Sequence, residues 1–199
     1  MDGNPVAIID SGGANIASVS FALDRLGASY EVTADTAKIG SASHVILPGV
    51  GAAADAMERL HANNLAEFIP TLIQPVLGIC LGMQLLADAS DEDDVDCLGI
   101  VSGRAKKLEA GSGTPVPNIG WCRVSHTVSH ALLDGIDEGS YFYFLHSYAL
   151  DVSKYSLGTA KHQNEFTAIL AHNNFVATQF HPEKSSLAGT RLLANFLRM

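Results

Sequence analysis

The sequence has few of the features that direct a protein to a membrane, a nucleic acid or an oxidising compartment. It contains no run of about 18 uncharged apolar residues, and its N-terminus, with an early acid and a short apolar run, does not resemble a signal peptide. Only 12 of the 199 residues are Lys or Arg, against 21 Asp and Glu, so no basic surface for nucleic acid or an anionic membrane is expected. Three cysteines form neither a CxxC pair nor an even disulfide framework, which predicts reduced thiols in a cytoplasmic protein.

Cofactor and metal motifs are also missing. The glycines near residue 12 lack the G-x-G-x-x-G spacing of a dinucleotide-binding turn, so no nucleotide cofactor is expected. His126 and His130 are four residues apart but lie in a stretch with β-branched neighbours, which argues against a helical metal pair. We therefore expect neither a cofactor nor a metal.

What the chain does contain is a regular alternation of short apolar runs and helical patterns. Buried strands are expected at 6–9, 44–47, 75–79, 141–146, 167–171 and 175–180. Amphipathic helices are expected at 16–26, 52–60, 81–89 and 185–197. Without an internal repeat or linker, this pattern predicts one α/β domain over residues 1–199: an open, mostly parallel sheet covered by helices on both faces, with some antiparallel strands in the second half.

The segment Gly78–Gly82, G-I-C-L-G, has the form of a nucleophile elbow with cysteine as the nucleophile. Glycines on both sides allow a strand to turn sharply into a helix, which exposes the sulfur of Cys80 at the helix N-terminus. The positive end of the helix dipole favours the reactive thiolate there. The backbone N–H of Leu81 is then directed to where an oxyanion would form. A buried structural cysteine between two packing glycines is the alternative for this segment.

A thiol nucleophile needs a base, and the base needs a group that orients it. His181 follows the strand at 175–180, and Pro182 ends that strand. Glu183 lies two residues further on, so in an extended backbone it points to the same side as His181. His146 is the rival base, but no acid is paired with it.

Two segments, G-I-C-L-G-M-Q at 78–84 and Q-F-H-P-E-K-S at 179–185, resemble the signatures of class I glutamine amidotransferases. Further segments are similar to the glutaminase subunits of imidazole glycerol phosphate synthase, in histidine biosynthesis: I-D at 9–10, G-A-N at 13–15, P-G-V-G at 48–51, V-P-N-I-G-W at 116–121, Y-F-L-H-S-Y at 143–148 and L-A-N-F-L at 193–197. The resemblance extends from about residue 6 to the last residue.

The resemblance implies a flavodoxin-like glutamine amidotransferase fold and a glutaminase with the triad Cys80, His181 and Glu183. Its oxyanion hole would use backbone N–H groups of Leu81, Val50 and Gly51, from a turn that changes conformation in the family. Glycines on both sides of Val50 make such a peptide flip physically reasonable, because a flip requires residues that tolerate positive φ.

Substrate and partner residues are implied in the same way. Those that would bind glutamine are Gly49, Gln84, Glu92, His146, Ser147 and Tyr148. The partner would be a (β/α)8-barrel cyclase that uses the ammonia to make imidazole glycerol phosphate and an aminoimidazole carboxamide nucleotide. The two chains would form a heterodimer through segments that carry Asn15, Trp121 and Lys184.

Several positions depart from the family pattern. Asn118 and Ile119 stand where the family usually has His and Met, Cys122 stands where it has Asn, and the loop at 11–14 is also unusual. These departures lie away from the triad, so they bear on docking and on the acceptor pathway. The alternatives are a glutaminase subunit for another acceptor, a cysteine hydrolase on the same fold and, less favoured because the triad is intact, a regulatory subunit without activity.

Overall fold

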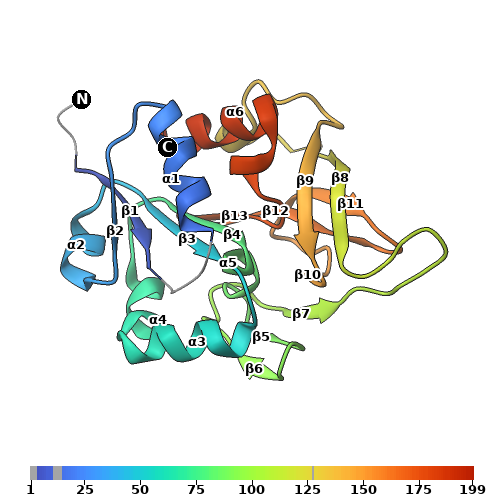
Figure 1. The fold of residues 1–199 in the computed structure, drawn as a ribbon, viewed down its shortest axis with the longest axis horizontal. Helices are drawn as coiled ribbons and strands as arrows, with labels where there is room; N and C mark the ends of the chain where they lie inside the picture. Colours follow the sequence, from blue (N-terminus) through green and yellow to red (C-terminus); the bar gives the residue numbers. More distant parts are fainter. Residues whose placement is uncertain (1–3, 11–14, 127) are drawn as a thin grey trace.

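The structure, a computed structural model, describes residues 4–10, 15–126 and 128–199 (Figure 1). Its α-helices there are α1 (Ile16–Arg25), α2 (Thr36–Ser41), α3 (Ala53–Ala62), α4 (Leu65–Phe68), α5 (Leu81–Gln84) and α6 (Ser186–Phe196). Its 3₁₀ helices are η1 (Ile69–Thr71), η2 (Ala131–Leu133) and η3 (Pro182–Lys184). The loop at 11–14, whose sequence departs from the family, lies outside the described residues. No helix in the described ranges is long and apolar enough to cross a membrane.

A long mixed sheet forms the centre of the molecule. Its strands lie in the order β2 (Tyr30–Thr33), β1 (Val6–Ile9), β3 (Val45–Gly49), β4 (Val76–Cys80), β13 (Phe175–Thr178), β12 (Glu165–His172), β11 (Ser156–Lys161), β8 (Asn118–Ser125) and β9 (Tyr141–His146). The first five of these are parallel to their neighbours in that group, and the pairs from β13 to β9 are antiparallel. The predicted α/β class, with antiparallel strands in the second half of the chain, is confirmed.

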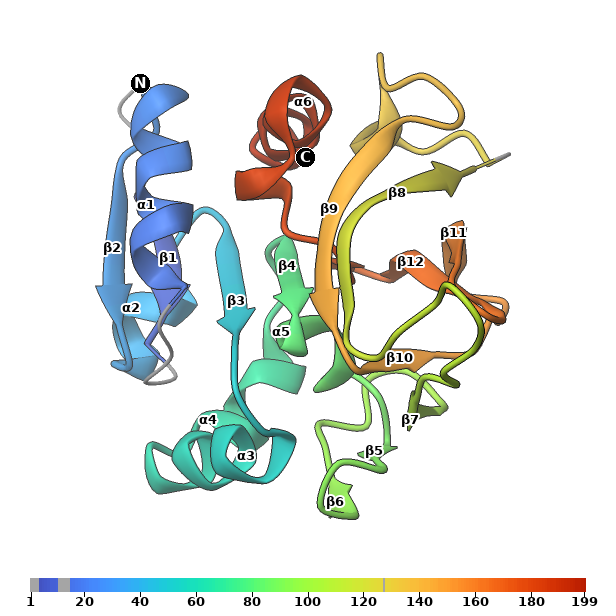
Figure 2. The ribbon, with the colours of Figure 1, turned by 45° about the vertical axis from the view of Figure 1, so that its right-hand side comes forward.

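A smaller sheet was not predicted. It consists of β10 (Tyr148–Leu150), β7 (Arg104–Lys107), β5 (Ala89–Ser90) and β6 (Val95–Asp96). Figure 2 shows β5 and β6 beside α3 and away from the strands of the long sheet. Strands of two to four residues carry too short a pattern of alternation to be recognised in a sequence.

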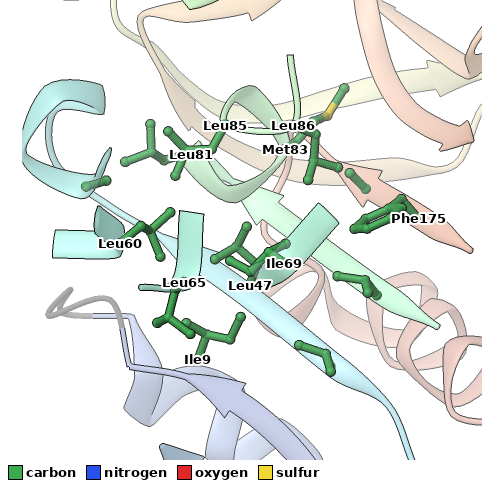
Figure 3. Packing of buried hydrophobic residues seen from close by; sticks show 14 of the residues in the cluster. Ile9, Leu47, Leu60, Leu65, Ile69, Leu81, Met83, Leu85, Leu86 and Phe175 are labelled. Atoms are coloured by element: carbon green, nitrogen blue, oxygen red, sulfur yellow. The ribbon is translucent and has the colours of Figure 1, made fainter. Parts of the chain in front are cut away.

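Helices cover both faces of the parallel strands, as predicted. In one buried cluster, α1 and α6 pack on apolar residues of β1, β3 and β4. This cluster includes Val19 of α1, Ile46 of β3 and Phe196 of α6. The other joins α2, α3, α4 and α5 to the opposite face, where Leu47, Leu60 and Leu81 pack together (Figure 3). Successive residues of a strand point to opposite faces, so the all-apolar runs of these strands supply both clusters.

The helix predicted at 81–89 is wrong in length, because α5 ends at Gln84. The next backbone carbonyls do not continue the helix. Those of Leu85, Leu86 and Ala87 accept hydrogen bonds from N–H groups of residues 98–101. The chain therefore leaves the helix to join the smaller sheet, and α5 is a single turn.

Candidate active site

Cys80 ends β4 and begins the turn into α5, with φ of 55° and ψ of −109°. This conformation is strained for a residue other than glycine, and such strain is found at functional sites. The flanking glycines permit close packing: a Cβ on Gly82 would lie 1.9 Å from the carbonyl oxygen of Leu47, and one on Gly78 would lie 2.8 Å from the carbonyl oxygen of Gly82. The segment thus forms the sharp strand-to-helix turn that its sequence predicts.

Sheet order explains how a histidine about 100 residues away reaches this cysteine. β4 and β13 are parallel neighbours in which Ile79 pairs with Thr178, so the segments that follow these two strands leave the sheet at the same edge. Beyond β13, the backbone N–H of His181 donates to the carbonyl oxygen of Tyr143 at 2.9 Å, which attaches this segment to β9. The carboxyl ends of parallel strands are where functional residues of α/β sheets gather.

His181 and Glu183 form a buried pair. The Nδ1 atom of His181 lies 2.9 Å from Oε1 of Glu183, and both side chains are almost fully shielded from solvent. The expected contact is present, but the backbone that produces it differs from the expectation. Residues 182–184 form the 3₁₀ helix η3 rather than an extended strand, and this turn brings the carboxylate back to the ring.

Opposing effects act on the pKa of His181. Burial by itself would lower it, but hydrogen bonds with Cys80 and Glu183, together with their negative charges, raise it to about 9. An imidazole with such a pKa is protonated at neutral pH. A protonated imidazole in this position can donate a proton to a leaving group, as the general acid beside a cysteine nucleophile does.

Asn15 is a fourth member of this cluster. Its side-chain Nδ2 donates to Oε1 of Glu183 at 2.7 Å and lies 3.2 Å from Nδ1 of His181. The resemblance implied a partner contact for Asn15. In the structure its side chain is buried, makes no cap hydrogen bond to α1 and points to the His181–Glu183 pair.

The turn after β3 lies opposite Cys80, because Gly49 pairs with Cys80 across β3 and β4. Val50, Gly51 and Leu81 line the same pocket as Cys80, and Gly49 is not among its lining residues. Glycine is required at positions 49 and 51 for different physical reasons. Gly51 has φ of 95° and open space around it, whereas a Cβ on Gly49 would lie 2.8 Å from the backbone N of Gly82. Gly51 thus needs glycine for its positive φ, whereas Gly49 needs it for lack of space.

Gln84 lines the same pocket but is nearly buried. Its Nε2 donates to the carbonyl oxygen of Tyr148 at 2.8 Å and to Oε1 of Gln179 at 3.1 Å. Nε2 of Gln179 lies 3.8 Å from the sulfur of Cys80. Sequence reasoning missed Gln179 as a site residue, although it belongs to the Q-F-H-P-E segment two residues before His181.

Glu92 reaches the pocket from the acidic stretch at 91–96. Its Oε2 accepts a hydrogen bond at 2.9 Å from the backbone N–H of Ala53, at the start of α3. Burial raises the pKa of Glu92, and the charges of Asp93 and Asp55 act in the same direction, while the bond from Ala53 opposes them. This carboxylate is therefore held by the helix that follows the 48–51 turn and is not a purely solvated loop charge.

The pocket is also lined by His146, Ser147 and Tyr148. Nδ1 of His146 lies 2.9 Å from the carbonyl oxygen of Tyr148, and its Nε2 lies 3.0 Å from Nδ2 of Asn118. Burial lowers the pKa of His146 to about 4, against a smaller opposing effect of the bond to Tyr148. A neutral ring with both nitrogens engaged is poorly placed to serve as the base for Cys80.

The pocket measures about 310 Å³, which suits a ligand of amino-acid size. Trp121 and Lys184, expected at a partner interface, are both exposed. Trp121 shares the outer face of the β8–β9 pair with the exposed Ile119 and Leu145. Among the described residues, no group of three or more His, Cys, Asp or Glu side chains is arranged to hold a metal.

Comparisons with known proteins agree with this geometry. The family model for class-I glutamine amidotransferases matches residues 7–199. The imidazole glycerol phosphate synthase subunit HisH 2 of Legionella pneumophila is 46% identical over 194 residues, which cover 98% of each chain. The HisH subunit of Haemophilus influenzae is 46% identical over 192 residues, covering 96% of each. A solved glutamine amidotransferase structure superposes with a TM-score of 0.76 at 15% identity over 97% of each chain, which shows the shared fold. The chain therefore belongs to the class-I glutamine amidotransferase family, among the relatives of the HisH subunits of imidazole glycerol phosphate synthase.

Proposed function

We propose that this chain is the glutaminase subunit of an imidazole glycerol phosphate synthase, and that it hydrolyses glutamine and passes the ammonia to a cyclase subunit. The observation that carries the proposal is that Cys80, in its strained turn, and His181, which is paired with the buried Glu183, line one amino-acid-sized pocket. Family membership supplies the substrate class, because relatives of nearly the same length are named as subunits of that synthase.

The chemistry follows from these groups. The thiolate of Cys80 attacks the side-chain amide carbon of glutamine, and backbone N–H groups of Leu81 and the turn at 50–51 stabilise the oxyanion. Protonated His181 donates its proton to the amide nitrogen, ammonia leaves and a glutamyl thioester remains. The neutral imidazole then takes a proton from water, hydroxide attacks the thioester, and glutamate departs as the thiolate is restored. Glu183 keeps the ring in position during both proton transfers.

Substrate orientation is assigned to the pocket walls. Glu92 supplies a carboxylate for the glutamine ammonium group, and the backbone at 146–148 faces the substrate carboxylate. Gln84 contributes polar surface at the base of the pocket. These roles fit a small polar ligand that carries both charges.

Ammonia released into water would be protonated and would lose its nucleophilicity, so transfer requires a docked partner. Exposed Ile119, Trp121 and Leu145 form an apolar surface on β8 and β9, and the carbonyl oxygen of Leu145 lies 3.6 Å from the sulfur of Cys80. A barrel cyclase bound to this surface, with Lys184 at its edge, would lie next to the site where ammonia forms.

The test is glutamate release from glutamine by the purified chain, measured alone and with a barrel cyclase and its nucleotide ligand. We expect strong stimulation by the cyclase, its loss in Cys80→Ala and its retention in the control Cys97→Ala, which removes a half-buried thiol outside the pocket. Glutamate release at the same rate with and without the cyclase would support the glutaminase activity but refute the cyclase as its partner. No release under either condition would refute the glutaminase itself, and cleavage of peptides instead would indicate a cysteine hydrolase.

A further inference from the structure

Gln179 is a polar side chain within hydrogen-bond range of Cys80 that the triad chemistry leaves unused. It is completely buried, just beyond β13, and its backbone N–H donates to the carbonyl oxygen of Ala168 at 2.9 Å. Its Nε2 lies 3.8 Å from the sulfur of Cys80, within the range of a sulfur hydrogen bond. A buried carboxamide beside a nucleophile is costly to maintain unless both its donor and its acceptor are used.

The orientation of this carboxamide follows from a single backbone carbonyl. The oxygen of Tyr148 can only accept, so the amide atom of Gln84 at 2.8 Å from it must be the nitrogen. The same nitrogen faces Gln179 at 3.1 Å, so the carbonyl side of Gln179 must point toward Gln84. The amino group of Gln179 is then directed at the sulfur.

The Tyr148 carbonyl is itself fixed from the other side. Nδ1 of His146 lies 2.9 Å from it, and Nε2 of His146 lies 3.0 Å from the amide nitrogen of Asn118. The oxygen of Asn118 lies 3.6 Å from the thiol of Cys122, which can donate to it. The Tyr148 carbonyl thus accepts from His146 on the β8 side and from Gln84 on the Cys80 side, and polar contacts connect β8 with the sulfur through this oxygen.

The sulfur has two different neighbours in this arrangement. The carbonyl oxygen of Leu145, at 3.6 Å, can accept from a neutral thiol but does not stabilise a thiolate. An N–H group stabilises the anion more than the neutral form. Because α5 is a single turn, it supplies less dipole to Cys80 than the longer helix predicted from the sequence would have done. The N–H of Gln179 therefore contributes a larger share of the thiolate's stabilisation than it would beside a longer helix.

We propose that Gln179 is a further catalytic residue, a hydrogen-bond donor that stabilises the thiolate of Cys80, and that Gln84 and the Tyr148 carbonyl are positioning residues that hold its amino group toward the sulfur. The proposal deepens the glutaminase assignment and rests on it for the role of the thiolate. It also gives Gln84 a function that does not depend on contact with substrate.

The test uses Gln179→Met, which keeps the approximate shape of the side chain and removes the donor. The rate at which iodoacetamide alkylates Cys80 is measured across pH and followed in the Cys80 peptide by mass spectrometry. We expect the pH of half-maximal rate to rise by about one unit, with an unchanged plateau at high pH, because a hydrogen bond to a charged group has about that effect. The control is Gln74→Met, which loses a side-chain bond to the carbonyl of Ile39 outside the pocket and should reproduce the wild-type profile.

Gln84→Met provides a second route should Gln179→Met fail to fold, as judged by far-ultraviolet circular dichroism. It leaves Gln179 in place but frees its carboxamide, so a smaller shift in the same direction is expected. A profile identical to wild type in folded Gln179→Met, or in Gln84→Met where only that variant folds, would overturn the proposal. Alkylation needs no glutamine, so a wild-type protein that releases no glutamate would refute the proposed function while the profiles still decide the role of Gln179.

Discussion

Gly82→Ala should destabilise the protein and distort the site, although alanine ordinarily favours a helix. Gly82 lies in α5, and an added Cβ would be 1.9 Å from the carbonyl oxygen of Leu47, a backbone atom of β3. Real Cβ atoms essentially never approach another heavy atom within 3.0 Å, so α5 and β3 would have to separate by about 1 Å. A backbone carbonyl in the middle of a sheet cannot rotate away as a flexible side chain can.

The expected cost is about 3 kcal/mol, the upper end of what extra atoms in a packed core usually cost. The gain from replacing glycine by alanine in a helix offsets about 1 kcal/mol of this. A net loss of about 2 kcal/mol should lower the midpoint of urea unfolding by about 1 M. The same displacement moves Leu81 and the turn at 48–51, so glutamate release should fall by about a hundredfold.

Unfolding in urea, followed by circular dichroism at 222 nm, measures the stability change. The matched control is Gly40→Ala in α2, where the added Cβ would lie 3.4 Å from the Cζ atom of Phe68, a side-chain atom that can move. That variant should be as stable as wild type or slightly more stable. If Gly82→Ala unfolded at the same midpoint as Gly40→Ala, the inference that the Leu47 contact requires glycine would be wrong.

Two further predictions concern the polar groups of the site. Asn15→Ala removes the N–H that donates to Oε1 of Glu183. The free energy of unfolding at pH 7 should therefore fall by about 2 kcal/mol, and glutamate release should fall about tenfold. Unchanged release would show that His181 alone positions the carboxylate. Burial lowers the pKa of His146 to about 4, so on acidification the unfolded chain binds a proton at this imidazole near pH 6.5 while the folded protein does not. The free energy of unfolding should therefore fall by up to about 3 kcal/mol as the pH drops from 6.5 to 4. The slope of unfolding free energy against pH in this window should be smaller in His146→Asn, and an equal slope would assign the acid sensitivity to other groups.

Local patterns in the sequence identified the parts of the molecule whose structure depends on near neighbours. The strands at 6–9 and 141–146 have the predicted bounds, and the final helix differs by one residue at each end. The strand–cysteine–helix turn could be predicted because the requirement for glycine on both sides of Cys80 is local. The approach of Glu183 to His181 was also predictable, since two residues of separation restrict it strongly, although the backbone is a 3₁₀ turn.

Contacts between distant segments could not be read in the same way. That Asn15 faces Glu183, and that Gln179 lies between Gln84 and Cys80, depends on the parallel pairing of β4 with β13 and on the path of β9. The end of α5 at Gln84 depends on residues 98–101, which take the carbonyls that would have continued the helix.

The sequence by itself therefore determined the fold class, the strand-to-helix turn at Cys80 and the approach of Glu183 to His181, because hydrophobic periodicity and the steric demands of a tight turn are properties of residues close together in the chain. The tertiary structure alone decided which polar side chains surround these groups, and in what hydrogen-bonded order. Those contacts arise when segments 60 to 170 residues apart meet at one sheet edge, and burial then requires each polar group to find a partner there.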